Sequence, residues 1–140
     1  GGWDTHSNNF KTLAKQLPLV DRGIANLIQG LHDRGMHDDV VTVMWGEFGR
    51  TPKVNGSAGR DHWSPVMGAM VAGGGLKMGQ VIGQSTADGG DPHTEQHDLD
   101  SLLATVMHTV LDLGQVRLMT GLPQDMLRAI TTPKPITGLV

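Results

Sequence analysis

A short apolar run at residues 40–45 constrains the fold of this chain more than any other feature. The run, Val-Val-Thr-Val-Met-Trp, lacks polar alternation, and such runs are typical of strands that are covered on both faces. Strands of this kind form parallel sheets with helices on both sides. The Gly-rich polar segment that follows, residues 46–62, lies where open α/β sheets place their ligands. We therefore predict an α/β fold with a mostly parallel sheet flanked by helices.

Two apolar stripes predict the helices. Apolar residues spaced by threes and fours over residues 13–31 predict a first helix. Pro18 removes a backbone donor in its middle, which predicts either a kink or a new helix start, and Gly35 suits the C-terminal cap. A second stripe follows Asp98, a candidate N-cap, and ends near Gly114. The other expected elements are a buried strand at 66–72, an edge hairpin at 77–84, a surface loop at 85–96 and a short helix at 124–130.

Composition excludes several classes of function. The chain has 140 residues, about the size of one domain, and a formal net charge of −3. Its Lys and Arg residues are dispersed, so nucleic acid is not an expected partner. No apolar run approaches the roughly 20 residues that a membrane span requires. The absence of cysteine excludes disulfides, thiolate metal sites and a cysteine nucleophile.

Acidic and histidine residues gather in three motifs that are rich in Gly and Trp. Asp4 and His6, one residue apart, would point to the same side of an extended segment and could share one cation. His62 could supply a third ligand, and its neighbour Asp61 a further carboxylate. The alternative is that Asp4 caps the following helix and His6 is a surface residue. The three motifs are Gly-Gly-Trp-Asp-Thr-His at 1–6, Gly-Glu-Phe-Gly-Arg-Thr-Pro at 46–52 and Gly-Arg-Asp-His-Trp at 59–63.

Three more charged residues flank this candidate centre. Glu47 follows the end of the predicted strand and is a further candidate metal ligand, or else the ion-pair partner of Arg50 or Arg60. The guanidinium groups of these two arginines suit a substrate with a tetrahedral oxyanion such as phosphate or sulfate, and loop-bracing salt bridges are the alternative. The set predicts a divalent metal, Zn²⁺ first, with Mn²⁺, Fe²⁺, Ca²⁺ or Mg²⁺ as alternatives, and metal-assisted hydrolysis.

Several longer blocks carry a family resemblance. They are Gly-Gly-Trp-Asp-Thr-His-Ser-Asn-Asn-Phe, Trp-Gly-Glu-Phe-Gly-Arg-Thr-Pro, Gly-Arg-Asp-His-Trp, Ala-Gly-Gly-Gly-Leu-Lys-Met-Gly-Gln-Val-Ile-Gly and Asp-Leu-Asp-Ser-Leu-Leu-Ala-Thr-Val. In this order, over residues 1 to about 113, they resemble the C-terminal half of the sulfatase-like bacterial proteins grouped as domain-of-unknown-function family 1501. Beyond residue 113 the resemblance fades.

The resemblance implies a branch of the alkaline phosphatase and sulfatase superfamily, with its three-layer α/β sandwich. It implies that residues 1–140 are the C-terminal part of one such domain, whose N-terminal half would be the partner and would supply the nucleophile upstream of Gly1. In that superfamily an early Asp and His from one loop and a late His from another share one metal, and Asp4, His6 and His62 resemble these residues by motif. Phe48 stands where a second metal would need a histidine, so a standard second site is not implied.

The implied function is hydrolysis of a phosphate or sulfate ester, of a small molecule or a glycan, by the intact parent protein. The resemblance also implies a periplasmic or exported protein, because such proteins often carry a twin-arginine signal. A competing interpretation is a degenerate, non-catalytic relative that keeps a structural metal, or none, and serves as a binding module.

Overall fold

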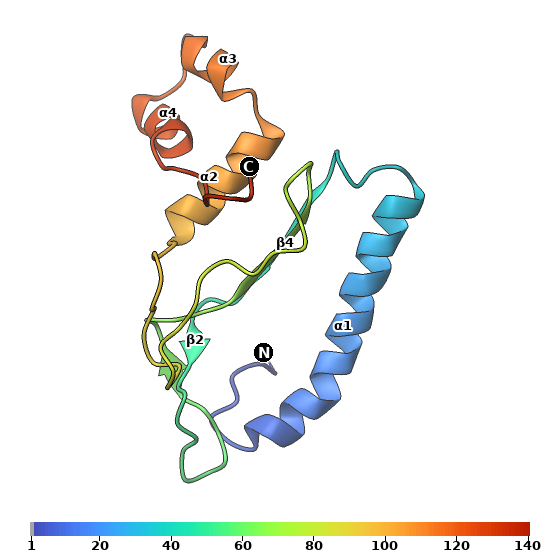
Figure 1. Cartoon of the computed structure of the whole chain (residues 1–140), viewed down its shortest axis with the longest axis vertical. Coiled ribbons are helices and arrows are strands. Elements are labelled where there is room, and N and C mark those ends of the chain that lie inside the picture. The colour runs from blue at the N-terminus through green and yellow to red at the C-terminus, as the bar shows by residue number, and fades with distance from the viewer. Residues whose placement is uncertain (1) are drawn as a thin grey trace.

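The computed structural model describes residues 2–140, which form four helices and two small antiparallel sheets (Figure 1). The mixed α/β composition agrees with the prediction. In chain order the elements are α1 (Asn9–Asp33), β1 (Val41–Trp45), β2 (Gly49–Arg50), β3 (His62–Trp63), β4 (Ala69–Gly73), α2 (Leu99–Val110), α3 (Leu113–Leu118) and α4 (Gln124–Thr131).

The predicted mostly parallel sheet is wrong for the strand pairs of residues 2–140. β1 pairs with β4 in antiparallel register, with Val41 opposite Gly73 and Trp45 opposite Ala69. β2 pairs with β3, also antiparallel, inside the connection from β1 to β4. A parallel pair needs a crossover, usually a helix, and this connection contains none. Residues 41–73 therefore form one long two-stranded ribbon with the loop 51–61 at its tip.

The predicted burial of the first strand on both faces is also wrong for this structure. The first three residues of β1 are half-buried, while Met44 and Trp45 are exposed. The reason is that a two-stranded ribbon has few neighbours: α2 contacts β1, whereas α1 makes no extensive contact with a strand or another helix. Figure 1 shows α1 running along one side of the ribbon.

α1 is a single 25-residue helix that continues through Pro18, so the predicted restart at Pro18 is wrong. The predicted cap at Gly35 is confirmed: Gly35 has a φ of +67°, its N–H donates to the carbonyl of His32, and the N–H of Met36 donates to that of Leu31. These two bonds form a Schellman motif. Part of the apolar stripe of α1 remains exposed, since Leu17 is half-exposed.

The C-terminal helices enclose most of the buried apolar side chains. Leu102 and Ala104 of α2 are buried, as are Leu113 and Val116 of α3. Thr105 is fully buried, and its hydroxyl donates to the carbonyl of Ser101 and accepts from the N–H of Ile136, which ties the C-terminal tail to α2.

Several predicted elements of the second half of the chain are confirmed. Asp98 caps α2 by accepting from the N–H of Ser101, and α4 lies where a short helix was expected. The strand predicted at 66–72 is found as β4, but its predicted burial is wrong, because Ala69 is exposed and the other residues of β4 are half-buried. The edge hairpin at 77–84 is wrong, because no strand forms there within the described residues, and α3 was not predicted.

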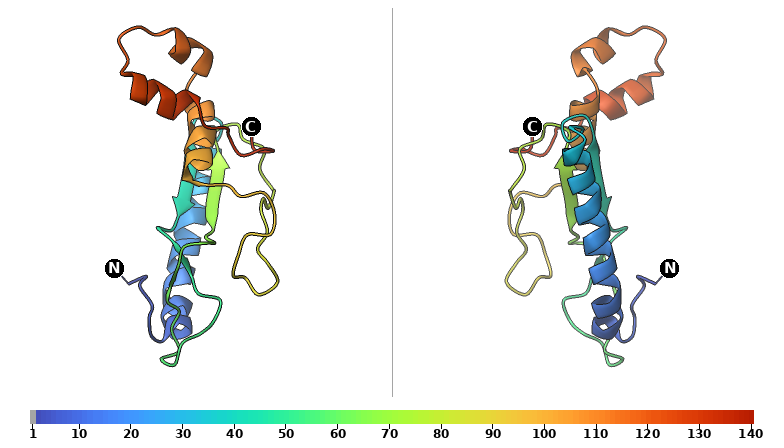
Figure 2. Two further views of the ribbon diagram at one scale, coloured as in Figure 1. Left: turned by 90° about the vertical axis from the view of Figure 1, so that its left-hand side faces the viewer. Right: turned by 90° about the vertical axis from the view of Figure 1, so that its right-hand side faces the viewer.

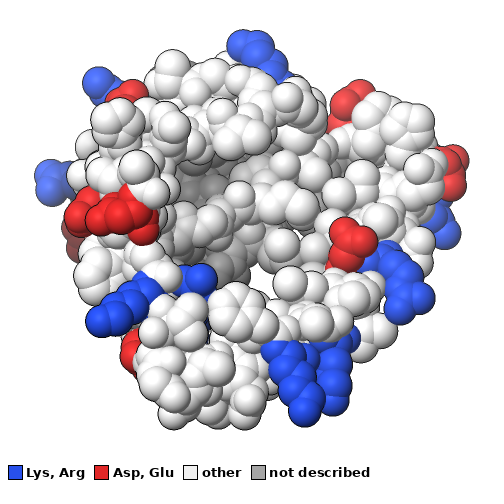
Figure 3. All heavy atoms as spheres, turned by 60° about the horizontal axis from the view of Figure 1, so that its bottom comes forward, with Lys and Arg blue, Asp and Glu red and all other residues white. Residues whose placement is uncertain are grey.

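The molecule is elongated and exposes more surface than a compact protein of its mass. Its accessible area is 9702 Å², whereas a compact 14.9 kDa monomer exposes about 7,000 Å². Figure 2 shows how thin it is in two side views, and Figure 3 shows basic and acidic side chains interspersed on its lower face. Among residues 2–140, no helix combines the length and the hydrophobicity of a bilayer span.

Candidate metal centre

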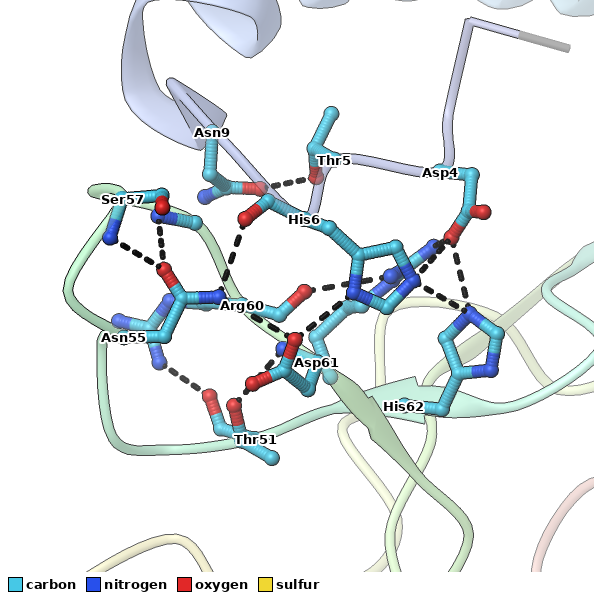
Figure 4. Close-up of polar contacts among 12 residues, drawn as sticks. Asp4, Thr5, His6, Asn9, Thr51, Asn55, Ser57, Arg60, Asp61 and His62 are labelled. Carbon is cyan, nitrogen blue, oxygen red and sulfur yellow. Dashed lines mark hydrogen bonds and ion pairs between the residues drawn. The ribbon is translucent and has the colours of Figure 1, made fainter.

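Three of the predicted ligands meet near the tip of the ribbon. His62 Nε2 lies 2.8 Å from Asp4 Oδ1 and 3.2 Å from His6 Nε2, and His6 Nε2 lies 3.1 Å from Asp4 Oδ1. Asp4 and His6 come from the segment before α1, and His62 comes from β3. Figure 4 shows the two imidazole rings and the carboxylate turned toward one another.

The spacing of these atoms fits a small divalent cation. A tetrahedral Zn²⁺ with bonds of about 2.0–2.1 Å holds its ligand atoms about 3.3 Å apart. The observed separations of 2.8 to 3.2 Å are slightly shorter, so a small outward movement of the side chains would accommodate the ion. Three exposed protein ligands leave a fourth position open for water or substrate, as in catalytic zinc sites.

Asp61 orients His6 rather than joining the three-ligand cluster. Its Oδ1 lies 2.7 Å from His6 Nδ1, and bonds from His6 and then Asn55 lower the pKa of the Asp61 carboxyl. Because a carboxylate only accepts, His6 Nδ1 carries the hydrogen, and in the neutral ring Nε2 keeps a lone pair that faces Asp4 and His62. A carboxylate on the far nitrogen is the usual support of a metal-binding histidine.

Asn55 joins the two loops, and it was not among the site residues predicted from the sequence. Its Nδ2 donates to the carbonyl of His6 and to Asp61 Oδ1, and its Oδ1 accepts from the backbone N–H groups of Ser57 and Gly59. The Asn55-Gly56 dipeptide is a turn signal that could have identified this residue.

Backbone contacts fix the N-terminal segment against the ribbon tip. Arg60 N donates to Thr5 O, and Asn8 N donates to Ser57 O. A Cβ atom at Gly59 would collide with the backbone of His6, so only glycine allows this close approach. The interpretation of Asp4 as a helix cap is wrong, because Asn8 is the N-cap residue of α1.

Arg50 pairs with Asp4 rather than with Glu47. Its Nη2 donates to Asp4 Oδ1 at 2.7 Å and to Trp3 O, and its Nη1 donates to Arg60 O. The bond from His62 and then that from Arg50 lower the pKa of Asp4 from its usual value to about 2. Asp4 is therefore ionised at neutral pH, as a metal ligand must be.

Arg60 was predicted to bind substrate and Glu47 to bind the metal, and neither residue belongs to the three-ligand cluster. Arg60 donates to the carbonyls of Thr51 and Pro52, which favours the loop-bracing alternative, although through backbone carbonyls rather than salt bridges. Glu47 is exposed and lies outside the three-ligand cluster. Its role as a metal ligand stays a prediction.

An open cavity of about 390 Å³ lies beside the three ligands. The Phe48 ring packs 4.1 Å from the His62 ring, centroid to centroid, and the Arg50 guanidinium lies 5.8 Å from the Phe48 ring centre. The cavity therefore combines the Phe48 wall and the Arg50 guanidinium with three of the predicted metal ligands, which are Asp4, Glu47 and His62. Its lining residues are Trp3, Asp4, Gly46, Glu47, Phe48, Arg50 and His62.

Comparison with known protein families identifies one match. The model of the family described as "Protein of unknown function (DUF1501)" matches residues 1–138. The chain belongs to this family. No curated protein and no solved structure matches it. Membership in DUF1501 confirms the resemblance of the sequence blocks, while the proposed link of DUF1501 to sulfatases stays a prediction.

Proposed function

We propose that this DUF1501 chain binds one divalent cation, Zn²⁺ first, through Asp4, His6 and His62, and that the intact protein hydrolyses a phosphate or sulfate ester at that centre. The observation that carries the proposal is the convergence of three ligand atoms, no more than 3.2 Å apart, from two segments far apart in the sequence. Asp61 on the outer nitrogen of His6 supports it further.

The surrounding residues fit ester hydrolysis. A cation held here would stabilise charge on the transferring group or activate water. Asp61 keeps the lone pair of His6 Nε2 directed at the centre, and Asn55 holds the Asp61 carboxylate. Arg50 stands at the cavity wall, where a guanidinium can bind an oxyanion.

The exposed surface of β1 and α1 supports the finer proposal about the fold. We propose that the N-terminal half of the same domain covers these elements and completes a three-layer sandwich of alkaline-phosphatase type. The half-exposed Trp45 and Leu17 support this proposal, because apolar side chains of this size are usually buried. The export that the resemblance implies belongs to the same proposal.

A second candidate function is a non-catalytic module that keeps a structural metal. The observation in its favour is the cavity lining, which within residues 2–140 offers carboxylates and an imidazole but no hydroxyl nucleophile. In this case the cation would tie the N-terminal segment to the ribbon without any reaction.

Zinc titration of the wild type and of His62→Ala tests the proposal. The variant should bind Zn²⁺ at least about 100-fold more weakly, because it loses one of three ligands. His108→Ala, which changes an exposed histidine on α2, is the matched control and should bind as the wild type does. Equal binding by all three proteins would refute the metal centre.

Hydrolysis of aryl phosphate and aryl sulfate by the intact protein separates the two candidate functions. The enzyme should cleave one of these esters, and His62→Ala should abolish that activity. Zinc binding without hydrolysis of either ester would favour the non-catalytic module.

A further inference from the structure

One carboxylate oxygen of Asp4 lies within 3.1 Å of nitrogen atoms from three residues in the candidate metal centre. Asp4 Oδ1 accepts from Arg50 Nη2 at 2.7 Å, and the same oxygen lies 2.8 Å from His62 Nε2 and 3.1 Å from His6 Nε2. It is therefore both the anchor of the guanidinium and the atom best placed to complete a three-ligand cation site.

A divalent cation and a guanidinium on this one oxygen would repel each other. A cation bonded to Asp4 Oδ1 would also withdraw the electron density that the Arg50 N–H group uses. The side chain of Arg50 is only 23% exposed, so water screens this repulsion less than it would at an open surface. Cation binding should thus weaken the bond from Arg50 to Asp4.

The contacts of Arg50 allow the guanidinium to turn without leaving the site. Its Nη1 donates to Arg60 O, in the loop 51–61, and its Nη2 also donates to Trp3 O, so these backbone bonds can hold the side chain at the site when the bond to Asp4 is lost. Its planar group already lies 5.8 Å from the Phe48 ring centre and lines the cavity. A small rotation would direct the N–H group released from Asp4 into the cavity beside the cation.

We propose that Arg50 couples the two ligands of this site: cation binding releases Arg50 from Asp4, and the released guanidinium then binds the oxyanion of the second ligand. This inference rests on the proposed cation site and adds an order of binding to it. A tetrahedral oxyanion would bind after the cation, held by the cation on one side and by a two-pronged guanidinium on the other. Before the cation binds, Arg50 contributes little to oxyanion affinity.

Calorimetric titration with inorganic sulfate, which keeps Zn²⁺ in solution, tests the coupling in the full chain. Arg50→Gln should leave sulfate affinity unchanged without Zn²⁺ and lower it about tenfold with Zn²⁺, since only the released guanidinium contacts the anion. The same variant should bind Zn²⁺ more tightly than the wild type, because the competitor for Asp4 is gone.

Two further variants distinguish the guanidinium fork of Arg50 from its positive charge. Arg50→Lys keeps the charge and tests whether the fork is needed; it should retain only part of the Zn²⁺-dependent sulfate binding. Arg22→Gln removes one positive charge from α1, away from the centre, and should match the wild type in every titration.

The outcomes separate this inference from the proposed function. Weaker Zn²⁺ binding by Arg50→Gln would show a supporting role and overturn the inference, as would an equal loss of sulfate affinity with and without Zn²⁺. Unaltered sulfate affinity of Arg50→Gln in the presence of Zn²⁺ would overturn it too. In all three cases the Zn²⁺ site itself stands, whereas wild-type protein that binds no Zn²⁺ refutes the proposed function and the inference together.

Discussion

The candidate metal centre and the C-terminal helices are held together by opposite means. Around the centre, exposed or half-exposed polar groups bond to one another, and Asn55 alone makes four hydrogen bonds, three within its own loop and one to the carbonyl of His6. In the C-terminal region α4 packs against both α2 and α3, and Leu102 of α2 and Leu113 of α3 are buried. One region is defined by directional bonds and the other by apolar burial.

The orientation of side chains and the stability of the fold therefore depend on different groups in this chain. Hydrogen bonds among exposed groups add little net stability but fix orientation, whereas burial adds stability with little directional control. A substitution in one region should therefore leave the other largely unchanged.

The largest effect is expected from Leu102→Ala. Leu102 is 7% exposed on α2, and truncating such a buried leucine costs about 2–5 kcal/mol of unfolding free energy. Urea denaturation followed by circular dichroism measures the loss, with the exposed Leu118→Ala as control. At low urea the folded variant should bind Zn²⁺ as the wild type does, and a parallel loss of zinc affinity would break the comparison.

Asp61→Ala should weaken zinc binding and leave the stability of the fold almost unchanged. Removing the carboxylate that orients His6 should weaken Zn²⁺ binding by about 10- to 100-fold. The urea midpoint should hardly move, because Asp61 is exposed. Asp88→Ala, in the loop between β4 and α2, is the matched control for zinc titration. Unchanged zinc affinity in Asp61→Ala would mean that His6 needs no partner.

The smallest expected effect is on how the stability of the folded chain depends on pH through Asp98, the N-cap residue of α2. Bonds from the backbone N–H and then the hydroxyl of Ser101 lower the pKa of Asp98. Since the folded-state pKa lies below the ordinary value of 3.8, the stabilisation is complete above that pH and is lost as the pH falls through the folded-state pKa.

Comparison of the wild type with Asp98→Asn isolates this contribution. The asparagine still accepts from Ser101 but cannot titrate, so the melting temperatures of the two proteins should differ more at pH 6 than at pH 3. Asp21→Asn on α1 serves as control and should show no such dependence on pH. A constant difference at both pH values would contradict the linkage.

The helix ends that depend on a single capping residue could be predicted from the sequence. Asp98 marks the start of α2 because its side chain caps the adjacent turn, and Gly35 ends α1 because it adopts a positive φ. The direction of strand pairing could not be predicted, because it depends on the path that residues 46–68 take from β1 to β4. The apolar composition of β1 is the same for either direction.

The three clustered ligands of the candidate centre were predicted from the sequence. The residues that hold those ligands in place, Asp61 and Asn55, were not predicted in that role. The spacing of Asp4 and His6 predicts that they share a side, and the motif at 59–63 adds His62. Asp61 was expected as a further ligand, because sequence does not reveal which ring nitrogen a carboxylate faces. Asn55 was missed because its partners belong to loops that only the folded chain brings together.

The separation of His6 and His62 along the chain has a thermodynamic consequence. These residues are 56 positions apart, so a cation bonded to both would cross-link the N-terminal segment to the ribbon and close a large loop that contains all of α1. Such a clip restricts the denatured chain much as a disulfide does, for which a loop of this length corresponds to about 4 kcal/mol. In a chain without cysteine, a reversible bridge of this kind would make the attachment of the N-terminal segment to the ribbon sensitive to chelators.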